Sequence, residues 1–253
     1  MKEFNSDKHK EILSEDGSYT AYSTEYGEHY HSTKDGALNE SLLKHVIPAF
    51  SIVKKPEVYI LDICYGLGFN TLATLLYYKQ NRPQTKLHIY SPELDTTLVH
   101  SLENFTYPQE FKDFKEIIVA LSREGLYEDE HIYIEIFLGD AREYVKTFEK
   151  KFDIVYQDAF SPSSNPSLWT KEYFKDIKKA MRVDGILTTY SIALKTRIAL
   201  YENGFRVYLN EGKEFRGATL AAFKSLENFK LVDVEHKMKC NPDVISLRDT
   251  LEA

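Results

Sequence analysis

Short apolar runs alternate with amphipathic stretches along most of the chain. The apolar runs rich in β-branched and aromatic residues occupy residues 58–63, 86–91, 132–139 and 152–157. Helical patterns lie between or after them, at residues 71–81, 96–104, 109–121 and 141–148. Alternation of this kind is typical of a parallel sheet with crossover helices. The pattern therefore predicts an α/β domain with a Rossmann-like sheet.

The carboxyl-terminal part ends this alternation in an unusual way. A helix over residues 171–182 is followed by a strand at 185–191, a helix at 193–203, and two successive strands at 205–210 and 218–223. Two strands without a helix between them predict a seven-stranded, mostly parallel sheet with a reversed terminal hairpin. A plain dinucleotide-binding fold does not normally end so. Residues 224–253 are less regular, and we expect an extra strand or a short helix there.

The amino-terminal part is different. Residues 1–17 are polar and show no period, so we expect a loose extension. Residues 18–32 alternate aromatic and polar side chains around Gly27, which predicts a small antiparallel hairpin. A helical stretch then covers residues 40–53. We expect residues 1–50 to form an extension and residues 51–253 the main domain.

Composition narrows the class of protein. The 253 residues are 43% hydrophobic, enough for one large core. No apolar run approaches about 18 residues, and no signal-peptide pattern opens the chain, which predicts a protein that is neither exported nor membrane-spanning. Two cysteines fit a reducing cytoplasm, and scattered histidines predict no metal site. The net charge of -7 argues against non-specific coating of nucleic acid.

The first candidate for chemistry is the segment DICYGLGFN, residues 62–70, between a predicted strand and a predicted helix. Gly66 and Gly68 allow backbone conformations that side chains forbid, and the helix start offers free N–H groups. This arrangement favours nucleotide binding, although two glycines in a tight turn can be purely structural.

Three acidic residues stand at the carboxyl ends of predicted strands, where ligands bind in open α/β sheets. Glu93 suits ribose hydroxyls, Asp140 lies where an adenine amine would sit, and Asp158 ends the fourth strand. The alternative for Asp140 is capping of the helix that Ala141 opens.

Asp158 belongs to the segment QDAFSPSSNPSLW, residues 157–169. Its two prolines restrict the backbone, so we expect a stiff loop that fixes Asp158, Phe160 and Asn165. A stiff polar loop beside a cofactor suits positioning of an acceptor. The alternative is a tight connection in which Asp158 is satisfied by its own backbone.

These segments together resemble a known family. DICYGLGFN, SPELD, LGDAREY, DAFSPSSNPSLWT and RVDGILTTYS follow one another as in the methyltransferase domain of the tRNA enzyme that completes 5-methylaminomethyl modification of the wobble uridine. The resemblance spans residues 22–223. The loop departs from the family pattern because Cys64 stands where its first glycine would be. The chain is also too short for the flavin-dependent oxidase domain that is often fused to this methyltransferase, so we expect the stand-alone form, unable to remove a carboxymethyl group.

The resemblance implies a class I S-adenosylmethionine-dependent methyltransferase with tRNA as its partner. The residues that would bind the cofactor are Asp62, Cys64, Gly66, Gly68, Asn70, Glu93, Asp140, Ala141 and Asp158. The residues that would bind the substrate are Glu40, in a family-like segment DGALNE, and Phe160, Pro162, Asn165 and Trp169.

The implied reaction is methyl transfer to a primary amine, with Asp158 orienting the amine's lone pair. Phe160, Trp169 or a hairpin tyrosine would stack on the extruded base, with core packing as the alternative for Trp169. Candidate contacts to tRNA phosphates are Lys195, Arg197, Lys213, Arg216, Lys224, Lys230, Lys237 and Lys239.

Three other functions stay open at this point. A spermidine-synthase-like aminopropyltransferase would show further acids around Asp158, and no such cluster is evident in the sequence. A nicotinamide-dependent oxidoreductase is favoured by the glycine loop and Glu93. A non-catalytic cofactor-binding module would keep the loop without a use for Asp158.

Overall fold

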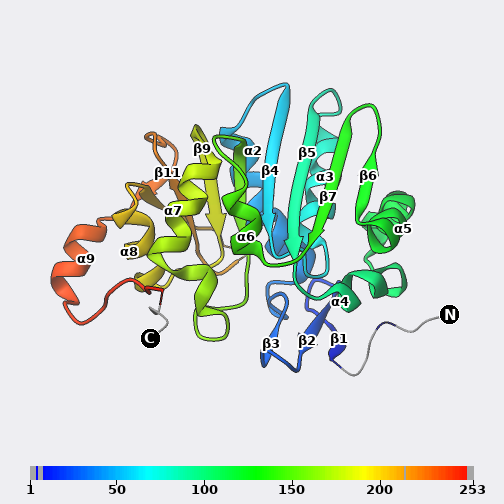
Figure 1. Ribbon diagram of the computed structural model, residues 1–253, viewed down its shortest axis with the longest axis horizontal. Helices are drawn as coiled ribbons and strands as arrows, with labels where there is room; N and C mark the ends of the chain where they lie inside the picture. Colours follow the sequence, from blue (N-terminus) through cyan, green and yellow to red (C-terminus); the bar gives the residue numbers. More distant parts are fainter. Residues whose placement is uncertain (1–3, 5–7, 214, 250–253) are drawn as a thin grey trace.

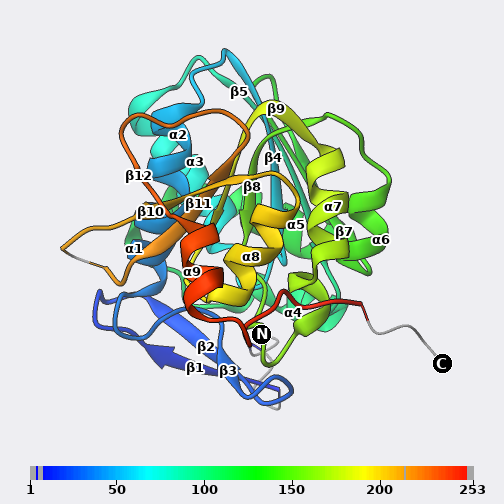
Figure 2. The ribbon, with the colours of Figure 1, turned by 90° about the vertical axis from the view of Figure 1, so that its left-hand side faces the viewer.

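A computed structural model describes residue 4, residues 8–213 and residues 215–249. Within these residues, nine strands form one sheet between two layers of helices (Figures 1 and 2). The strands are β4 (Glu57–Ile63), β5 (Lys86–Glu93), β6 (Leu126–Glu128), β7 (Ile132–Leu138), β8 (Phe152–Gln157), β9 (Met181–Thr189), β10 (Arg206–Asn210), β11 (Ala218–Ala222) and β12 (Lys230–Leu231).

The strand order is β12-β10-β11-β9-β8-β4-β5-β7-β6. The central strands are parallel, and β11 runs antiparallel to both of its neighbours, β9 and β10. This is the predicted seven-stranded sheet with a reversed terminal hairpin. The short strands β6 and β12 extend its two edges.

Helices cover the sheet because the central strands are apolar on both faces, as in β8, where every residue is buried. The α-helices of the main domain are α3 (Phe69–Asn81), α4 (Thr96–Ser101), α5 (Lys115–Glu124), α6 (Ala141–Lys146), α7 (Lys171–Ala180), α8 (Leu194–Glu202) and α9 (Val234–Cys240). Three short 3₁₀ segments occupy Leu102–Asn104, Gln109–Phe114 and Pro166–Trp169. In Figure 2, α3 lies on one side of the sheet and α6 and α7 on the other.

The amino-terminal segment forms a second, three-stranded antiparallel sheet of β1 (His9–Leu13), β2 (Tyr19–Ser23) and β3 (Glu28–His29). The predicted hairpin around Gly27 is present as β2 and β3. The expectation of a loose extension over residues 1–17 was wrong for β1, which pairs with β2 along its whole length. The sequence HKEIL hides this strand because its residues do not alternate between apolar and polar.

A helical run then passes from α1 (Ala37–Glu40) through a π-helical turn at Ser41–Val46 into α2 (Ile47–Ile52). The expected boundary at residue 50 therefore falls inside a helix. Such π turns widen a helix locally and are frequent at functional sites. The carboxyl ends of β4, β5 and β7 point toward the small sheet β1–β3 (Figure 1), and the site lies between them. Among the described residues, no helix is long and apolar enough to cross a membrane.

Candidate active site

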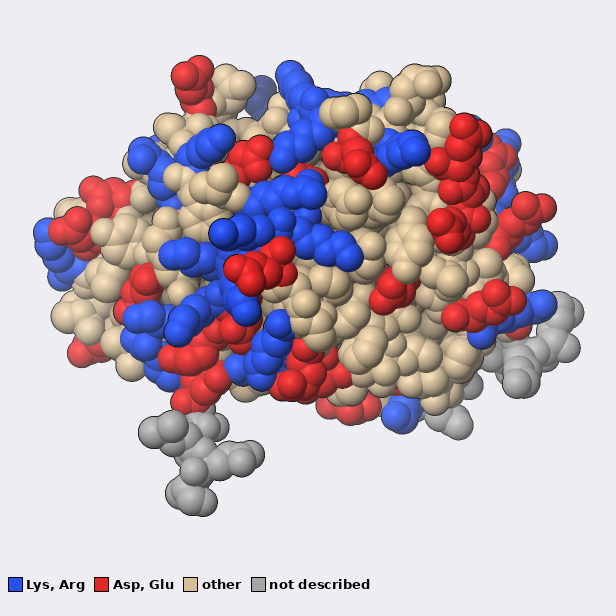
Figure 3. Space-filling model, turned by 45° about the horizontal axis from the view of Figure 1, so that its top comes forward, with Lys and Arg blue, Asp and Glu red and all other residues tan. Residues whose placement is uncertain are grey.

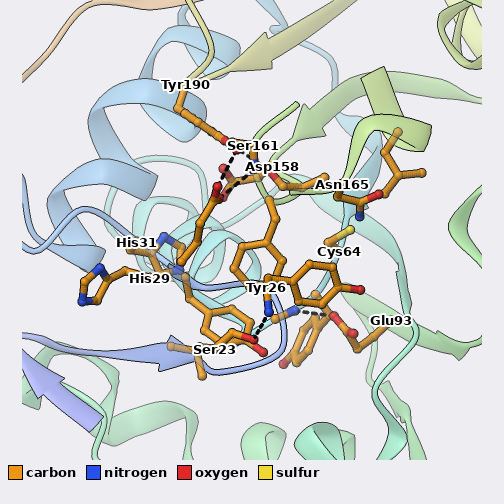
Figure 4. A pocket seen from close by; sticks show the side chains of 18 of the residues that line it. Ser23, Tyr26, His29, His31, Cys64, Glu93, Asp158, Ser161, Asn165 and Tyr190 are labelled. Atoms are coloured by element: carbon orange, nitrogen blue, oxygen red, sulfur yellow. Dashed lines mark hydrogen bonds between the residues drawn. The ribbon is translucent and has the colours of Figure 1, made fainter. Parts of the chain in front are cut away.

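A cavity of about 1230 Å³ opens at the carboxyl ends of the parallel strands (Figure 4). Pockets for a single small ligand usually measure roughly 300–1,000 Å³. This cavity therefore has room for a cofactor and part of a second substrate. It is walled by the loop after β4, the ends of β5 and β7, the loop after β8, and the small amino-terminal sheet.

The loop after β4 is shaped by three left-handed residues, Cys64 (φ 64°), Gly66 (φ 53°) and Gly68 (φ 77°). Cys64 thus adopts the conformation that a glycine in its place would adopt easily, at a cost of about 1–2 kcal/mol for an L-residue. Gly68 is the N-cap of α3, and a Cβ there would lie 2.7 Å from the hydroxyl oxygen of Tyr65. Cys64 and Gly66 line the cavity, whereas Gly68 shapes the turn behind it.

Glu93 is the last residue of β5 and ties the strand to this loop. One carboxylate oxygen accepts from the backbone N–H of Gly66 at 2.9 Å, and the other accepts from Leu94 and Asp95 at 2.8 and 2.9 Å. Burial raises the pKa of Glu93. The side chain lies on the cavity, where it can also receive hydroxyl groups.

Asp140 and Ala141 follow β7 and line the same side of the cavity. The carboxylate of Asp140 accepts from the backbone N–H of Arg142 at 2.6 Å, so it caps α6. The capping role and a place on the cavity are therefore compatible in this structure.

Asp158 lies at the base of the cavity, with its side chain 8% exposed. Asn70 donates its side-chain N–H to Asp158 at 2.8 Å, and Nε2 of His45 lies 3.5 Å from the other oxygen. Asp158 is thus held by the side chain of Asn70 in α3 rather than by its own backbone, with the His45 ring beside it. The π-helical turn carries His45 to this position, and Nδ1 of His45 is paired with Thr188.

Asp62 lies behind Asp158 and does not line the cavity. It accepts hydrogen bonds from Thr71 at 2.8 Å and from Asn70 at 3.4 Å, which fix the first turn of α3. Burial raises the pKa of Asp62 to about 7. Asp62 therefore supports Asn70 and the start of α3 from behind the cavity wall.

The loop after β8 is bound to the amino-terminal sheet. The carboxylate of Glu28 accepts from the backbone N–H of Ser161 at 3.0 Å and from the hydroxyls of Ser161 and Ser164. The ring of Phe160 stacks on Tyr26 with centroids 4.4 Å apart. Figure 4 shows Ser161 and Tyr26 facing the same cavity as Asp158.

The predicted loop residues divide between the cavity and the core. Phe160, Pro162 and Asn165 line the cavity. Trp169 is 0% exposed, and its indole N–H donates to the carbonyl of Phe160 at 2.8 Å. The interpretation of Trp169 as a base-stacking residue is therefore corrected to core packing, since the ring supports the loop from behind.

A buried charged cluster on the opposite wall was only partly expected. Glu40, predicted from the resemblance, accepts from the ammonium of Lys44 at 2.7 Å, and Lys44 also donates to Asp35 at 2.6 Å. Burial alone would raise the pKa of Glu40, but His31 and Lys44 lower it to about 2. The i,i+4 spacing of Glu40 and Lys44 was the sequence signal for this pair.

Within the described ranges, no group of three or more histidine, cysteine or acidic side chains could hold a metal ion. Of the cations considered for tRNA phosphates, Arg216 lines the cavity. Arg197 is buried and donates to the hydroxyl of Thr219 at 3.0 Å, so it is a structural residue.

Comparisons with known proteins agree with this geometry. Residues 108–225 match a family described as S-adenosyl-L-methionine-dependent methyltransferase. An uncharacterized protein of Methanocaldococcus jannaschii is 34% identical over 88% of this chain and 62% of its own length. The crystal structure of MnmC2 from Aquifex aeolicus superposes with a TM-score of 0.81 at 30% identity, covering 95% of this chain and 79% of that one. The chain belongs to the MnmC2 family.

MnmC2 family membership makes the protein a methyltransferase that uses S-adenosylmethionine, and it does not favour the oxidoreductase or aminopropyltransferase alternatives. A longer relative is the tRNA 5-methylaminomethyl-2-thiouridine biosynthesis bifunctional protein MnmC of Azoarcus, 28% identical over 77% of this chain. The chain spans 62% of the Methanocaldococcus protein and 32% of the Azoarcus protein.

The cavity fits this cofactor on structural grounds. The loop after β4 brings the backbone of Cys64 and Gly66 to the cavity wall, and Glu93 presents a carboxylate there. The side-chain oxygen of Asn70 is buried without a hydrogen-bond partner, so it is available to a ligand. Of the residues that the resemblance implies for the cofactor, those that line the cavity are Cys64, Gly66, Asn70, Glu93, Asp140, Ala141 and Asp158.

Proposed function

We propose that the protein transfers a methyl group from S-adenosylmethionine to the amine of 5-aminomethyl-uridine, thiolated or not, at the wobble position of tRNA. The observation that carries this proposal is Asp158, a carboxylate held by Asn70 at the base of a cavity large enough for two ligands. The names of the bifunctional relatives support the same substrate class. A tRNA substrate implies a cytoplasmic reaction.

The chain's own groups mainly orient the amine. When bound, S-adenosylmethionine supplies an electrophilic methyl carbon. Asp158 accepts an amine N–H. We propose that the backbone carbonyl of Pro162 accepts another, since the carbonyls of Phe160 and Ser161 already accept hydrogen bonds within the loop. Because Asn70 fixes the carboxylate, an amine that is hydrogen-bonded to Asp158 keeps its lone pair in one direction. Alignment of this kind is the main way in which a protein accelerates an in-line transfer.

The aromatic wall suits an extruded base. Phe160 lies between Tyr26 and Tyr30, with centroids 4.4 and 4.9 Å away. Single-stranded RNA bases are commonly read by stacking on such rings. We propose that the uracil ring packs against Phe160 and Tyr26, with Asn165 beside them on the cavity wall.

We assign phosphate contacts near the target uridine to three cations. Arg216 lines the cavity, Lys213 lies three residues before it, and Lys195 lies two residues after Ala193, which also lines the cavity. Figure 3 shows Lys and Arg also gathered on the face at the amino-terminal ends of the strands. The exposed residues Lys150 and Lys179 shortly precede β8 and β9 in the chain. That face lies at the opposite end of the strands from the cavity.

Further acids do line the cavity, contrary to the expectation that none would cluster around Asp158. Asp35 and Glu40 both pair with Lys44, and the carboxylate of Glu28 is taken up by the serine loop. A polyamine-binding site needs acids that are free to pair with substrate ammonium groups. These pairings support the amine of a nucleoside over a polyamine as the acceptor.

The deciding experiment is incubation of the protein with labelled S-adenosylmethionine and tRNA that carries 5-aminomethyl-uridine, followed by nucleoside analysis. We expect label in 5-methylaminomethyl-uridine. A parallel reaction contains a polyamine and decarboxylated cofactor labelled in its aminopropyl group. Transfer of that label to the polyamine would overturn the proposal.

A further inference from the structure

His31 is a buried histidine on the cavity wall that the proposed mechanism leaves unused. Its side chain is 7% exposed and packs edge-on against the ring of Phe69, with centroids 5.2 Å apart. Its backbone N–H donates to the hydroxyl of Thr20, which anchors it to the small sheet. Nδ1 of His31 has no hydrogen-bond partner within 3.5 Å and lies 3.7 Å from Glu40.

Glu40 is fixed so that it can support this imidazole. One carboxylate oxygen accepts from Lys44, and the other accepts from the backbone N–H of Ser32 at 2.7 Å and faces Nδ1 of His31. At 3.7 Å the carboxylate attracts the ring proton electrostatically, which favours the tautomer protonated on Nδ1 and leaves Nε2 as the acceptor. In Figure 4, His31 and Glu93 lie on opposite sides of the cavity, so His31 is on the side away from the cofactor loop.

Several of the other ionisable groups on the cavity are poorly suited to take a proton near neutral pH, and His29, which also lines it, is exposed to solvent. Burial raises the pKa of the Tyr30 and Tyr190 hydroxyls and of the Cys64 thiol, which therefore stay protonated. The ammonium of Lys44 stays charged between its two acids. His9 is already paired through both ring nitrogens, with Tyr30 and with Asp95.

We propose that His31 is the proton acceptor for the substrate amine, with Glu40 as its positioning residue. The inference rests on the proposed function, since it assigns a role within that reaction. The free ring nitrogen of His31 takes a proton from the ammonium, R–CH₂–NH₃⁺, and becomes imidazolium. The released lone pair forms the new N–C bond, the donor's S–C bond breaks, and its electron pair stays on sulfur.

The charges facing His31 favour this exchange. They come from Glu40 on the helical run and from Asp158 and Asp62 on the strand ends, and Glu40 is itself paired with Lys44. Burial alone would lower the pKa of His31, but Glu40 and Asp158 raise it above the ordinary value. A more basic imidazole is better matched to an amine as its proton donor.

The test is the pH profile of kcat for wild type and His31→Gln, measured with saturating cofactor and 5-aminomethyl-uridine tRNA between pH 6.5 and pH 10, a range around the ordinary histidine and amine values. At neutral pH we expect a loss of about 10²-fold, the lower end of what a positioned base contributes. The loss should shrink as pH rises, because solvent then deprotonates the amine. Cofactor affinity, measured by calorimetry, should stay within a few-fold.

The matched control is His88→Gln, which removes another histidine paired with a glutamate, Glu57, at 2.9 Å. His88 lies outside the cavity lining, and its variant should follow the wild-type profile. A His31→Gln profile reduced by the same factor at every pH would overturn the proposal. Such a profile would indicate a structural defect, since raising the pH deprotonates the amine but does not repair the site.

Glu40→Gln provides a second readout that keeps the histidine. Loss of the carboxylate should lower the pKa of His31, so the acidic limb of the kcat profile should move to lower pH. An acidic limb at the wild-type position would contradict the roles of His31 as proton acceptor and of Glu40 as its positioning residue. Failure of the proposed function would look different, because wild type itself would then leave the tRNA unmethylated.

Discussion

The contact between Glu28 and the serine loop gives the sharpest single perturbation. Glu28→Gln keeps the shape of the side chain and removes its charge, while three hydrogen bonds from Ser161 and Ser164 are at stake. Hydrogen bonds to charged groups contribute roughly 1.5–3 kcal/mol and neutral ones about 0.5–1.5 kcal/mol. Because Glu28 is partly exposed, water competes, and we expect a total loss of about 1–2 kcal/mol of unfolding free energy.

Activity should fall as well as stability. The loop that Glu28 holds also carries Phe160 and Asp158, and small misplacements of reacting groups can cost about 10²-fold in rate. We expect kcat to drop roughly tenfold or more, with cofactor affinity within a few-fold, since the loop after β4 is untouched. Thermal unfolding, calorimetry and single-turnover kinetics measure the three quantities.

The pH dependence gives an internal check. Burial would raise the pKa of Glu28, but the serine hydrogen bonds hold it below the ordinary 4.5. A lowered pKa stabilises the fold above the unfolded value and loses that contribution as pH falls through the folded one. The stability gap between wild type and Glu28→Gln should therefore close below pH 4.5. The control is Glu25→Gln, whose exposed pair with Lys8 is 3.6 Å long. Equal behaviour of the two variants would refute the reasoning.

Further predictions concern the two walls of the cavity. Asp158→Ala should abolish methyl transfer to tRNA while cofactor affinity stays within a few-fold; unaltered turnover would remove Asp158 from the mechanism. Gly68→Ala should lower the melting temperature and weaken cofactor binding, because its Cβ would meet Tyr65 at a left-handed position that costs an L-residue about 1–2 kcal/mol; an unchanged melting curve would contradict this. Lys44→Met should cost about 3–5 kcal/mol at neutral pH by leaving Glu40 buried and unpaired. Since the folded pKa of Glu40 is about 2, that loss should narrow as pH falls from 4.5 toward 2, which denaturant titrations at several pH values would measure.

The sequence predicted the sheet well because its strands carry strong patterns. The apolar runs at residues 58–63 and 152–157 became the central strands β4 and β8, and the missing helix before residue 218 marked the reversed strand β11. The edges were harder. β6 is three residues long and β1 is mostly polar, so each is stabilised by backbone pairing with a neighbour rather than by a local pattern.

The site was predictable where its residues follow strands. Glu93, Asp140 and Asp158 all reach the cavity because the ends of parallel strands meet at one edge. His31 and His45 come from the amino-terminal part, and His45 pairs with Thr188, 143 residues away. No local sequence pattern predicts a contact between residues so far apart in the chain.

The docking of the small amino-terminal sheet onto the main domain is coupled to ligand binding. It is fastened to the main domain largely through groups that also line the cavity, Tyr26, Glu28 and His31 among them. A ligand that contacts both the small sheet and the main domain therefore stabilises their association by mass action. Amide hydrogens of β1 and β2 should exchange faster in the free protein than in the complex, which makes the first strands of the chain a reporter of occupancy at a site whose chemistry lies on the strands that follow.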